Sequence, residues 1–206
     1  MESKFSTKNL FAIGFLLIIL DQITKIAVKG FSLFGIQHDG MQLGDSIRVI
    51  GEAVQITYVE NAGMAFGITF GSGKIFLSLF SIIASIVLAY MICKMKNENL
   101  WVRLGFILIF AGASGNLIDR VFYGVFYGEM PLFYGHVVDF IQVDIPDIDI
   151  GSIHYTHFPI FNIADSCVTC GVALLIIVHK YIPNLTELFY RKPAPELANS
   201  SSEDSE

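Results

Sequence analysis

Four long apolar stretches divide this chain, and polar or mixed segments separate them. The stretches cover residues 10–28, 75–93, 100–118 and 161–178. As an α-helix, residues 10–28 measure about 28 Å, which is just enough to cross the hydrocarbon core of a bilayer. The pattern therefore predicts four transmembrane helices. The first stretch also fits a signal peptide, but no small-x-small cleavage site follows it, and a retained span is favoured.

The segment between the first two spans predicts a small β-sheet outside the membrane. Residues 46–50 and 54–59 are rich in β-branched residues, and Gly51-Glu52 offers a turn between them. We expect this sheet to lie flat on the membrane surface or over a site.

Two further segments interrupt the apolar pattern later in the chain. Residues 121–134 are rich in Phe and Tyr with glycines between them, which favours the boundary between membrane and water. Residues 144–149 carry three aspartates but lack the spacing and the closing Glu of an EF-hand. We therefore expect an interfacial aromatic insertion and an exposed acidic loop.

Composition supports a membrane protein with one folded domain. Hydrophobic residues make up 53% of the chain and charged residues only 16%, a balance too apolar for the surface of a soluble domain of this size. The net charge of -6 excludes general attraction to nucleic acid. Residues 193–206 are acidic and Ser-rich, so we expect a disordered tail after a single domain over residues 1–192.

The charge distribution predicts how the helices are oriented. Basic residues flank the ends of the spans that share a side with both termini, and acidic residues dominate the two long segments on the other side. By the positive-inside rule, both termini are cytoplasmic and the long segments external. Asp21, Asp139 and Asp165 then all fall near the outer face of the membrane.

Asp139 and Asp165 are the strongest candidates for chemistry, because each interrupts an apolar run. A carboxylate in a low-dielectric environment is costly, and one that is kept there usually has a function. Two such acids brought together can share one proton, as a water-activating aspartic peptidase requires. Taken singly, however, an Asp at a helix start is more often an N-cap than a catalyst, and Asp165 fits that description.

The other polar residues of the spans have structural explanations beside functional ones. Asp21 and Lys25 are four apart on a helix, so they can form an ion pair, and Lys25 can also extend outward to the membrane surface. Asn116, Asp119 and Arg120 form either a polar helix end, in which Asp119 and Arg120 offset each other's charge, or a polar wall beside a site.

No metal or organic cofactor is expected. His136, His154 and His157 do not follow a zinc-binding spacing, and the proposed chemistry requires neither metal nor nucleotide. Cys167 and Cys170 match a redox spacing, but they lie inside a predicted span and are interpreted as small packing residues.

Two other classes of function remain open from composition alone. A small proton-coupled transporter subunit would also use acids in the membrane, although the chain shows no inverted repeat or pair of broken helices. A membrane scaffold or assembly factor would need no acids.

Five short motifs, in order, resemble the bacterial lipoprotein signal peptidase family, also called type II signal peptidases. They are Asp21-Gln22-x-x-Lys25, Asn61-x-Gly63-x-Ala65-Phe66, Gly115-Asn116-x-x-Asp119-Arg120, Val138-Asp139-Phe140 and Phe161-Asn162-x-Ala164-Asp165. Each motif alone is weak, whereas five in this order on a profile of four spans are specific.

The resemblance implies a fold and an activity. It implies an all-α membrane fold, a bundle of four transmembrane helices with a small external β-cradle. It implies an aspartyl endopeptidase of the bacterial inner membrane that faces the periplasm and cuts prolipoproteins just before a cysteine carrying a diacylglyceryl group. Its partners would be these substrates and membrane lipid, with no nucleic acid, and we expect a monomer.

The resemblance also implies roles for individual residues. Asp139 and Asp165 are expected to form the catalytic pair. Site-supporting roles are expected for Asn61, Asn116, Arg120 and Asn162, and structural roles beside the site for Asp21, Lys25 and Asp119. The stretches on both sides of Asp139 are longer than the family pattern, and these insertions bear on how the site is covered.

Overall fold

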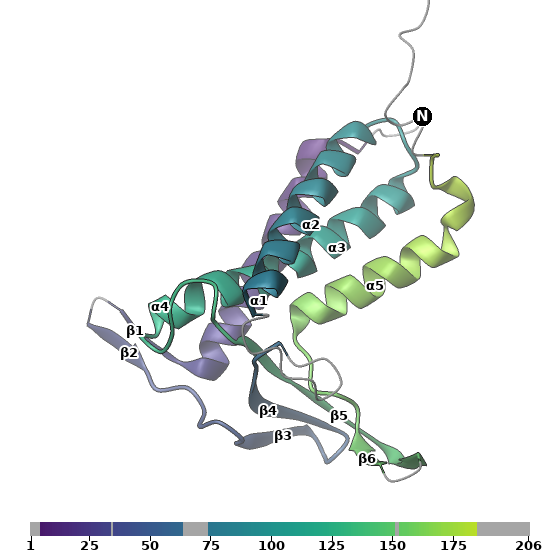
Figure 1. Ribbon diagram of the computed structural model, residues 1–206. Coiled ribbons are helices and arrows are strands. Elements are labelled where there is room, and N and C mark those ends of the chain that lie inside the picture. The colour runs from purple at the N-terminus through teal and green to yellow at the C-terminus, as the bar shows by residue number, and fades with distance from the viewer. Residues whose placement is uncertain (1–4, 34, 64–73, 151–152, 185–206) are drawn as a thin grey trace, which may run out of the picture.

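The structure is a computed structural model that describes residues 5–33, 35–63, 74–150 and 153–184. The long helices form one half of the molecule, and the strands lie at one end of them (Figure 1). The helices are α1 (Thr7–Lys29), α2 (Lys74–Lys94), α3 (Leu100–Ile118), α4 (Gly124–Phe126) and α5 (Ile163–Ile177), with a π-helix at Asp119–Tyr123 and a 3-10 turn at His179–Tyr181. The strands are β1 (Phe31–Leu33), β2 (Ile36–His38), β3 (Ser46–Ile50), β4 (Val54–Asn61), β5 (Val137–Ile150) and β6 (Ile153–His157).

The helices agree with the predicted spans, except for the length of the last one. In the described part of the chain, three helices are long and apolar enough to cross a membrane, over Thr7–Lys29, Ile75–Lys94 and Leu100–Phe126. α5 has 15 residues and is therefore about 22 Å long, shorter than the hydrocarbon core of a bilayer. The predicted span at residues 161–178 is thus a shorter apolar helix, because Phe161 pairs with Ile141 of β5 and the helix begins only after Asn162.

α3 is the central helix, and its glycines allow α5 to approach closely. A Cβ atom added at Gly112 would overlap the carbonyl oxygen of Ala164, and one at Gly105 would lie 2.6 Å from Leu175 Cδ2. Small residues at a helix interface let two backbones come together in this way. The start of α5, which carries Asp165, is therefore held directly against α3.

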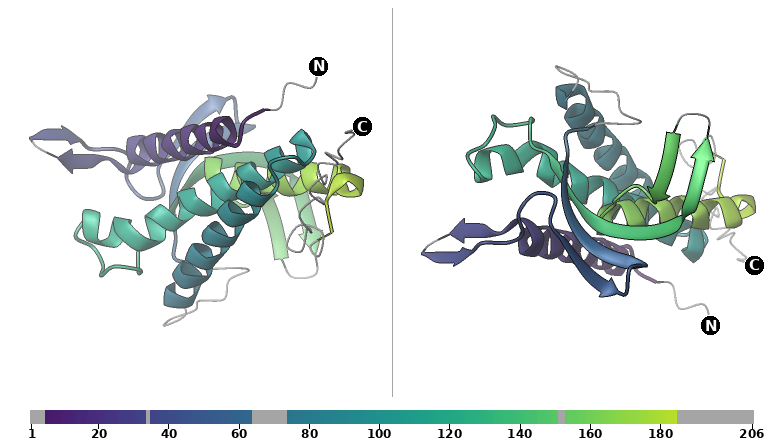
Figure 2. Two further views of the ribbon diagram at one scale, coloured as in Figure 1. Left: turned by 90° about the horizontal axis from the view of Figure 1, so that it is seen from above. Right: turned by 90° about the horizontal axis from the view of Figure 1, so that it is seen from below.

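The predicted strands are present, and the sheet is larger than predicted. β3, β4, β5 and β6 form an antiparallel sheet in that order, and β1 and β2 form a separate hairpin. Viewed from below, β4 and β5 curve beneath the helices (Figure 2).

The acidic loop predicted at residues 144–149 is wrong, because β5 continues through it and pairs with β6. The ladder shifts register between Asp144 and Ile148, around Pro146, which has no N–H to donate. Pairing with a partner strand decided the conformation here over local composition.

The aromatic insertion begins as a continuation of α3. The π-helix and α4 extend it to Phe126, and the chain then returns so that Gly135 N–H donates to the Arg120 carbonyl at 3.0 Å. Phe122, Val125 and Phe126 are exposed. Their exposure agrees with an interfacial position, which stays a prediction.

Candidate active site

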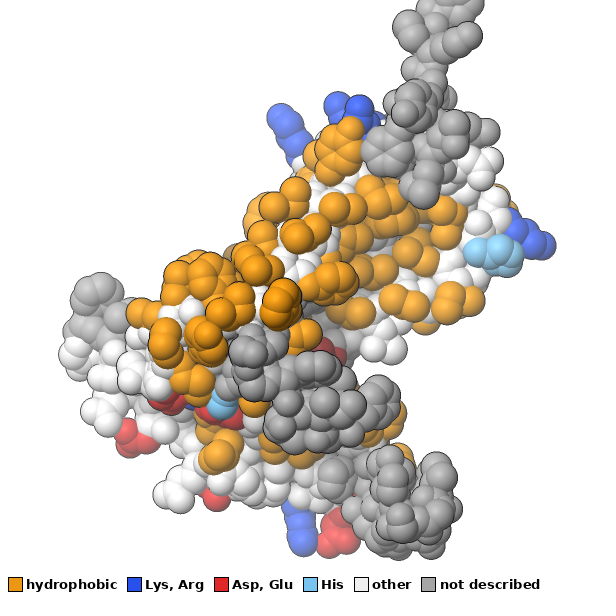
Figure 3. Space-filling view, in the orientation of Figure 1, with side chains coloured by type: hydrophobic (Ala, Val, Ile, Leu, Met, Phe, Trp, Pro, Cys, Tyr) orange, Lys and Arg blue, Asp and Glu red, His pale blue; other side chains and the backbone are white. Residues whose placement is uncertain are grey.

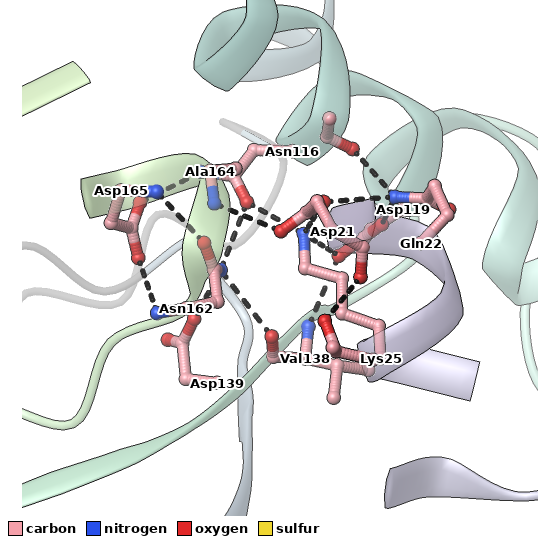
Figure 4. Close-up of polar contacts among 12 residues, drawn as sticks. Asp21, Gln22, Lys25, Asn116, Asp119, Val138, Asp139, Asn162, Ala164 and Asp165 are labelled. Carbon is pink, nitrogen blue, oxygen red and sulfur yellow. Dashed lines mark hydrogen bonds and ion pairs between the residues drawn. The ribbon is translucent and has the colours of Figure 1, made fainter. Parts of the chain in front are cut away.

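The two candidate aspartates come together where the sheet meets α5. Asp139 is the third residue of β5, and its side chain is buried; Asp165 lies in the first turn of α5 and is half-buried. Asn162 stands between them (Figure 4). Its Nδ2 donates to Asp139 Oδ1 at 2.7 Å, and its backbone N–H donates to Asp165 Oδ2 at 3.3 Å. One asparagine therefore donates a hydrogen bond to each of the two carboxylates.

Local sequence explains why α5 starts at this point. The Asn162 side chain accepts from the Asp165 N–H at 2.8 Å, and the Asp165 carboxylate accepts from the Asn162 N–H, which is a capping box. Asn162 is thus the N-cap, and the alternative of Asp165 as N-cap is wrong. Asp165 instead occupies the third helical position, and its carboxylate has a second oxygen available for other partners.

Asn116 connects this pair to the interior of the helices. Its Nδ2 donates to Asp165 Oδ1 at 2.8 Å, and its Oδ1 accepts from Asn162 Nδ2 at 3.0 Å and from Lys25 Nζ at 2.9 Å. Because both ends of the amide have partners of the right kind, its orientation is determined. The expected supporting positions of Asn116 and Asn162 are therefore found at the pair itself.

A fully buried ion cluster lies behind the aspartate pair. Lys25 Nζ is 2.9 Å from Asp21 Oδ2 and 2.7 Å from Asp119 Oδ2, and none of the three side chains is more than 1% exposed. The predicted pairing of Asp21 with Lys25 is confirmed. The outward extension of Lys25 is wrong. Asp119 forms its ion pair with Lys25, while the Arg120 charge is also close enough to act on Asp119.

The ion cluster also holds the backbone beside each candidate. Asp21 Oδ1 accepts from the Ala164 N–H at 2.9 Å, and Asp119 Oδ2 accepts from the Val138 N–H at 3.2 Å. Ala164 and Val138 directly precede Asp165 and Asp139. One cluster of charges thereby fixes both segments relative to α1 and α3.

Asp139 has the electrostatic setting of a carboxyl group that keeps its proton. Burial, followed by the negative charge of Asp165, raises the pKa of Asp139 to about 7. The hydrogen bonds from Asn61 and Asn162 and the charge of Lys25 oppose this rise. An acid with a raised pKa beside a second carboxylate is the condition under which one proton is shared by two groups.

Asn61 and Arg120 complete the predicted set. Asn61, the last residue of β4, hydrogen-bonds Asp139. Arg120 is half-buried and borders a small crevice that Ala62, Gly63, Leu77, Ser78 and Gly135 also line. Its charge is close enough to act on both Asp139 and Asp165. These positions agree with a polar wall beside the pair.

Several residues near the site were not predicted. Gln22 donates to Asp119 Oδ1 at 2.9 Å and accepts from Tyr123 OH at 3.0 Å. Its place in the first motif, directly after Asp21, was a usable signal. Glu60 directly precedes the second motif, but its contact with His136, on the far side of β4 and β5, joins residues 76 apart in the chain and is not visible in the local sequence.

The described residues hold no group of three or more His, Cys, Asp or Glu side chains placed to bind a metal ion. The polar groups around the aspartates are instead amides and a lysine, which donate hydrogen bonds to carboxylates.

Known proteins resemble this chain over most of its length. A family model described as signal peptidase (SPase) II matches residues 13–180. A lipoprotein signal peptidase from Pelodictyon phaeoclathratiforme is 40% identical, over 84% of this chain and 90% of the relative. One from Staphylococcus aureus is 38% identical, over 86% of this chain and 91% of the relative.

Solved structures also resemble it. A bacterial membrane enzyme determined by the in meso method at 1.9 Å resolution has a TM-score of 0.63 and 35% sequence identity, covering 87% of this chain and 97% of its own. The fold is therefore that of a membrane enzyme.

Proposed function

Because this chain belongs to the signal peptidase II family, whose members are aspartic peptidases that remove signal peptides from prolipoproteins, we propose that Asp139 and Asp165 are its catalytic pair. The chain is thus a hydrolase of lipoprotein processing, and its substrates are prolipoproteins. The transporter alternative is not favoured, since these relatives are peptidases.

The observation that carries the assignment is the single asparagine between the two acids. Asn162 contacts Asp139 through its amide and Asp165 through its backbone N–H. Two carboxylates held close together by one residue cannot both ionise readily. The pair therefore presents one carboxylate and one carboxylic acid to the substrate.

The raised pKa of Asp139 suggests a role for each acid. Asp139, whose pKa is raised to about 7, keeps the proton and donates a hydrogen bond to the scissile carbonyl oxygen. Asp165, which accepts from Asn116 and Asn162, takes a proton from the attacking water. Attack gives a tetrahedral diol, and return of a proton to the peptide nitrogen releases the signal peptide.

The position of the pair suits a substrate that is partly lipid. Asp139 belongs to β5 and Asp165 to the apolar helix α5, so the pair lies where the sheet meets the helices (Figure 4). The diacylglyceryl group of the substrate can stay in the bilayer beside the helices while the peptide reaches the pair. Cleavage falls just before the lipidated cysteine.

The distribution of charge supports an orientation in the bacterial inner membrane. Lys and Arg side chains gather mainly at the helical end of the molecule, and carboxylates gather around the sheet (Figure 3). Both termini then lie in the cytoplasm and the pair faces the periplasm near the outer leaflet. The unit is one peptidase domain over residues 1–192, active as a monomer, and the predicted acidic tail at residues 193–206 lies outside the residues that the structure describes.

Replacement of each aspartate by asparagine tests the assignment. Asp139→Asn or Asp165→Asn removes one of the two titrating groups, so no cleavage of a diacylglyceryl-modified prolipoprotein is expected in purified protein in lipid. Asp45→Asn is the matched control, since Asp45 is exposed in the turn before β3, and it keeps full activity. Product formation is read by mass spectrometry, and normal cleavage by either folded site variant would refute the pair.

A further inference from the structure

The strand pair that carries Asp139 has a second face, and Glu60 lies on it. In the β4–β5 ladder Val59 pairs with Asp139 and Asn61 with Val137, whereas Glu60 pairs with Val138. Successive side chains of a strand point to opposite faces. Glu60 is therefore on the face away from the catalytic carboxyl, although it directly precedes Asn61, which hydrogen-bonds that carboxyl.

The Glu60 carboxylate collects donors from three separate parts of the chain. It accepts from Lys29 Nζ at the end of α1, from Tyr58 OH on β4 at 2.5 Å, and from His136 Nδ1 at 3.1 Å. Burial acts to raise the pKa of Glu60, but the hydrogen bonds from Lys29 and Tyr58 outweigh it, so the pKa is lowered. An ionised carboxylate only accepts hydrogen bonds, so the proton of His136 resides on Nδ1.

Lys29 extends this arrangement to the aromatic insertion. Its Nζ lies 2.9 Å from Glu129 Oε1 and 4.4 Å from the centre of the Tyr127 ring. The Lys29 side chain is 6% exposed and that of Glu60 is 15% exposed. The Lys29–Glu60 contact is therefore screened little by water, whereas Glu129 is 44% exposed.

The Glu60–His136 contact lies at the end of the β4–β5 ladder. Asn61 and Val137 are the last partners of the β4–β5 ladder at this end. His136 directly precedes β5, so its contact with Glu60 crosses from one strand to the other where the backbone pairing stops. It holds the end of β4 against the start of β5, and with it Asn61 against Asp139.

We propose that Glu60 is a positioning residue for the catalytic pair, acting through Asn61 rather than touching the substrate. The proposal rests on the assignment of Asp139 as catalytic. Loss of the contacts that the Glu60 side chain makes lets the end of β4 move, so Asn61 no longer holds Asp139 in one orientation. The effect falls on the chemical step, because the lipid-binding surface of the helices is unchanged.

Kinetics of purified variants in lipid test this. Glu60→Ala is expected to lower kcat about 10-fold at unchanged KM, since small misplacements of catalytic groups cost rates of this order or more. Glu60→Gln retains an oxygen that accepts from Lys29 and Tyr58, and its NH2 can donate to His136 Nδ1 once the imidazole proton has moved to Nε2. It therefore keeps kcat within about 3-fold of wild type. Glu52→Ala is the control, because Glu52 pairs with Arg48 in the same sheet but is 73% exposed.

A double-mutant cycle with Asn61→Ala separates positioning from general stability. If Glu60 acts through Asn61, Glu60→Ala causes no further loss of kcat in the Asn61→Ala background. An equal loss in both backgrounds, or a wild-type kcat for Glu60→Ala, overturns the proposal. Should Glu60→Ala not accumulate, His136→Ala is expected to show the same non-additivity with Asn61→Ala, and additivity there also overturns it.

A different result would refute the assignment of Asp139 and Asp165 as the catalytic pair. Activity of Asp139→Asn refutes the catalytic pair, whereas an inactive Asp139→Asn together with an unaffected Glu60→Ala refutes only the positioning role.

Discussion

At the scale of single residues, the site depends on one buried cation. Lys25 contacts Asp21, Asp119 and Asn116, and it is fully buried. Lys25 thereby contacts the two carboxylates that accept from the backbone N–H groups of Ala164 and Val138, and also the Asn116 amide that donates to Asp165. A buried ion cluster of this kind is costly to disrupt, because each remaining charge loses its compensation without regaining water.

Lys25→Met is therefore expected to destabilise the protein strongly. Met keeps the length of the side chain but leaves Asp21 and Asp119 buried side by side without a cation, at a cost of about 3–5 kcal/mol. Thermal unfolding in lipid measures the loss as a lower Tm. The control is Arg48→Ala, which breaks an ion pair whose arginine is 69% exposed and should cost about 1 kcal/mol or less. Equal Tm values for the two variants would contradict the expectation.

The pH dependence of cleavage reports on Asp139. Its pKa is raised to about 7, so the proton is present below that value and lost above it. We expect kcat/KM to fall as the pH rises through about 7, because the pair then becomes doubly ionised.

Asn61→Ala is expected to shift the pH dependence of kcat/KM in a definite direction. The hydrogen bond from Asn61 stabilises the ionised form of Asp139 and so opposes the raised pKa. Its removal raises the pKa further, and the alkaline limb of kcat/KM moves to higher pH while the maximum rate falls. Glu52→Gln serves as the control and leaves the limb in place. A limb displaced to lower pH would show that Asn61 does not act on Asp139 in this way.

At the scale of elements, the approach of α5 to α3 places Asp165. Gly112 contacts the backbone just before Asp165, where an added Cβ would overlap the Ala164 carbonyl and lie 2.6 Å from Val168 Cγ2. A backbone carbonyl cannot move aside as the end of a flexible side chain can. The separation of these helices is therefore set by the absence of a side chain at one position.

Gly112→Ala is expected to push α5 outward. Overpacking of this kind costs about 1–3 kcal/mol, and the displaced Asp165 lowers kcat in the same variant. Both are measured in lipid, as Tm and as the rate of cleavage. Gly14→Ala on α1 is the matched control, because its added Cβ meets the Ile107 side chain, whose end lies 3.1 Å away, so smaller changes are expected. Unchanged Tm and kcat for Gly112→Ala would contradict the tight contact.

Elements differed in how far their local sequence predicted them. The strands at residues 46–50 and 54–59 were predicted from β-branched residues and a turn, and they are present as β3 and β4. β1 and β2 were not predicted, since each has only three residues, too few for a recognisable alternation. The extension of β5 past Asp144 depended on β6, a partner that local composition does not reveal.

At the scale of the whole molecule, the proposed orientation rests on apolar helices and a charged sheet end. The exposed apolar side chains of α1 and α2, such as Phe15, Leu16, Phe76 and Phe80, have no partner within the described chain that covers them. Lipid covers such surfaces in a membrane protein. The sheet end, by contrast, carries exposed charges such as Arg48 and Glu52.

Cysteine labelling tests the proposed orientation. In a background in which Cys93, Cys167 and Cys170 are replaced by Ala, Glu52→Cys is expected to react with a membrane-impermeant maleimide in intact spheroplasts. Lys96→Cys, on the turn between α2 and α3, reacts only after permeabilisation, because positively charged segments stay in the cytoplasm. Retained cleavage activity shows that each variant is folded, and the reverse labelling pattern would invert the topology.

The sequence by itself determined the membrane class, the positions of the apolar helices and the residues of the candidate site. These follow from hydropathy and from motifs that keep Asp139, Asp165, Asn61, Asn116 and Asn162 recognisable without knowledge of their contacts. The local spacing of Asp21 and Lys25 was also sufficient to predict their ion pair.

Only the tertiary structure decided which charges neutralise each other and how the pair is held. Asp119 is adjacent in sequence to Arg120, yet its partner is Lys25 on another helix. Asp165 is close to a helix start, yet Asn162 caps that helix and joins the two acids. The physical reason is that a buried carboxylate needs a donor or a cation beside it. The packing of helices and strands that are distant in the sequence determines which residue that is.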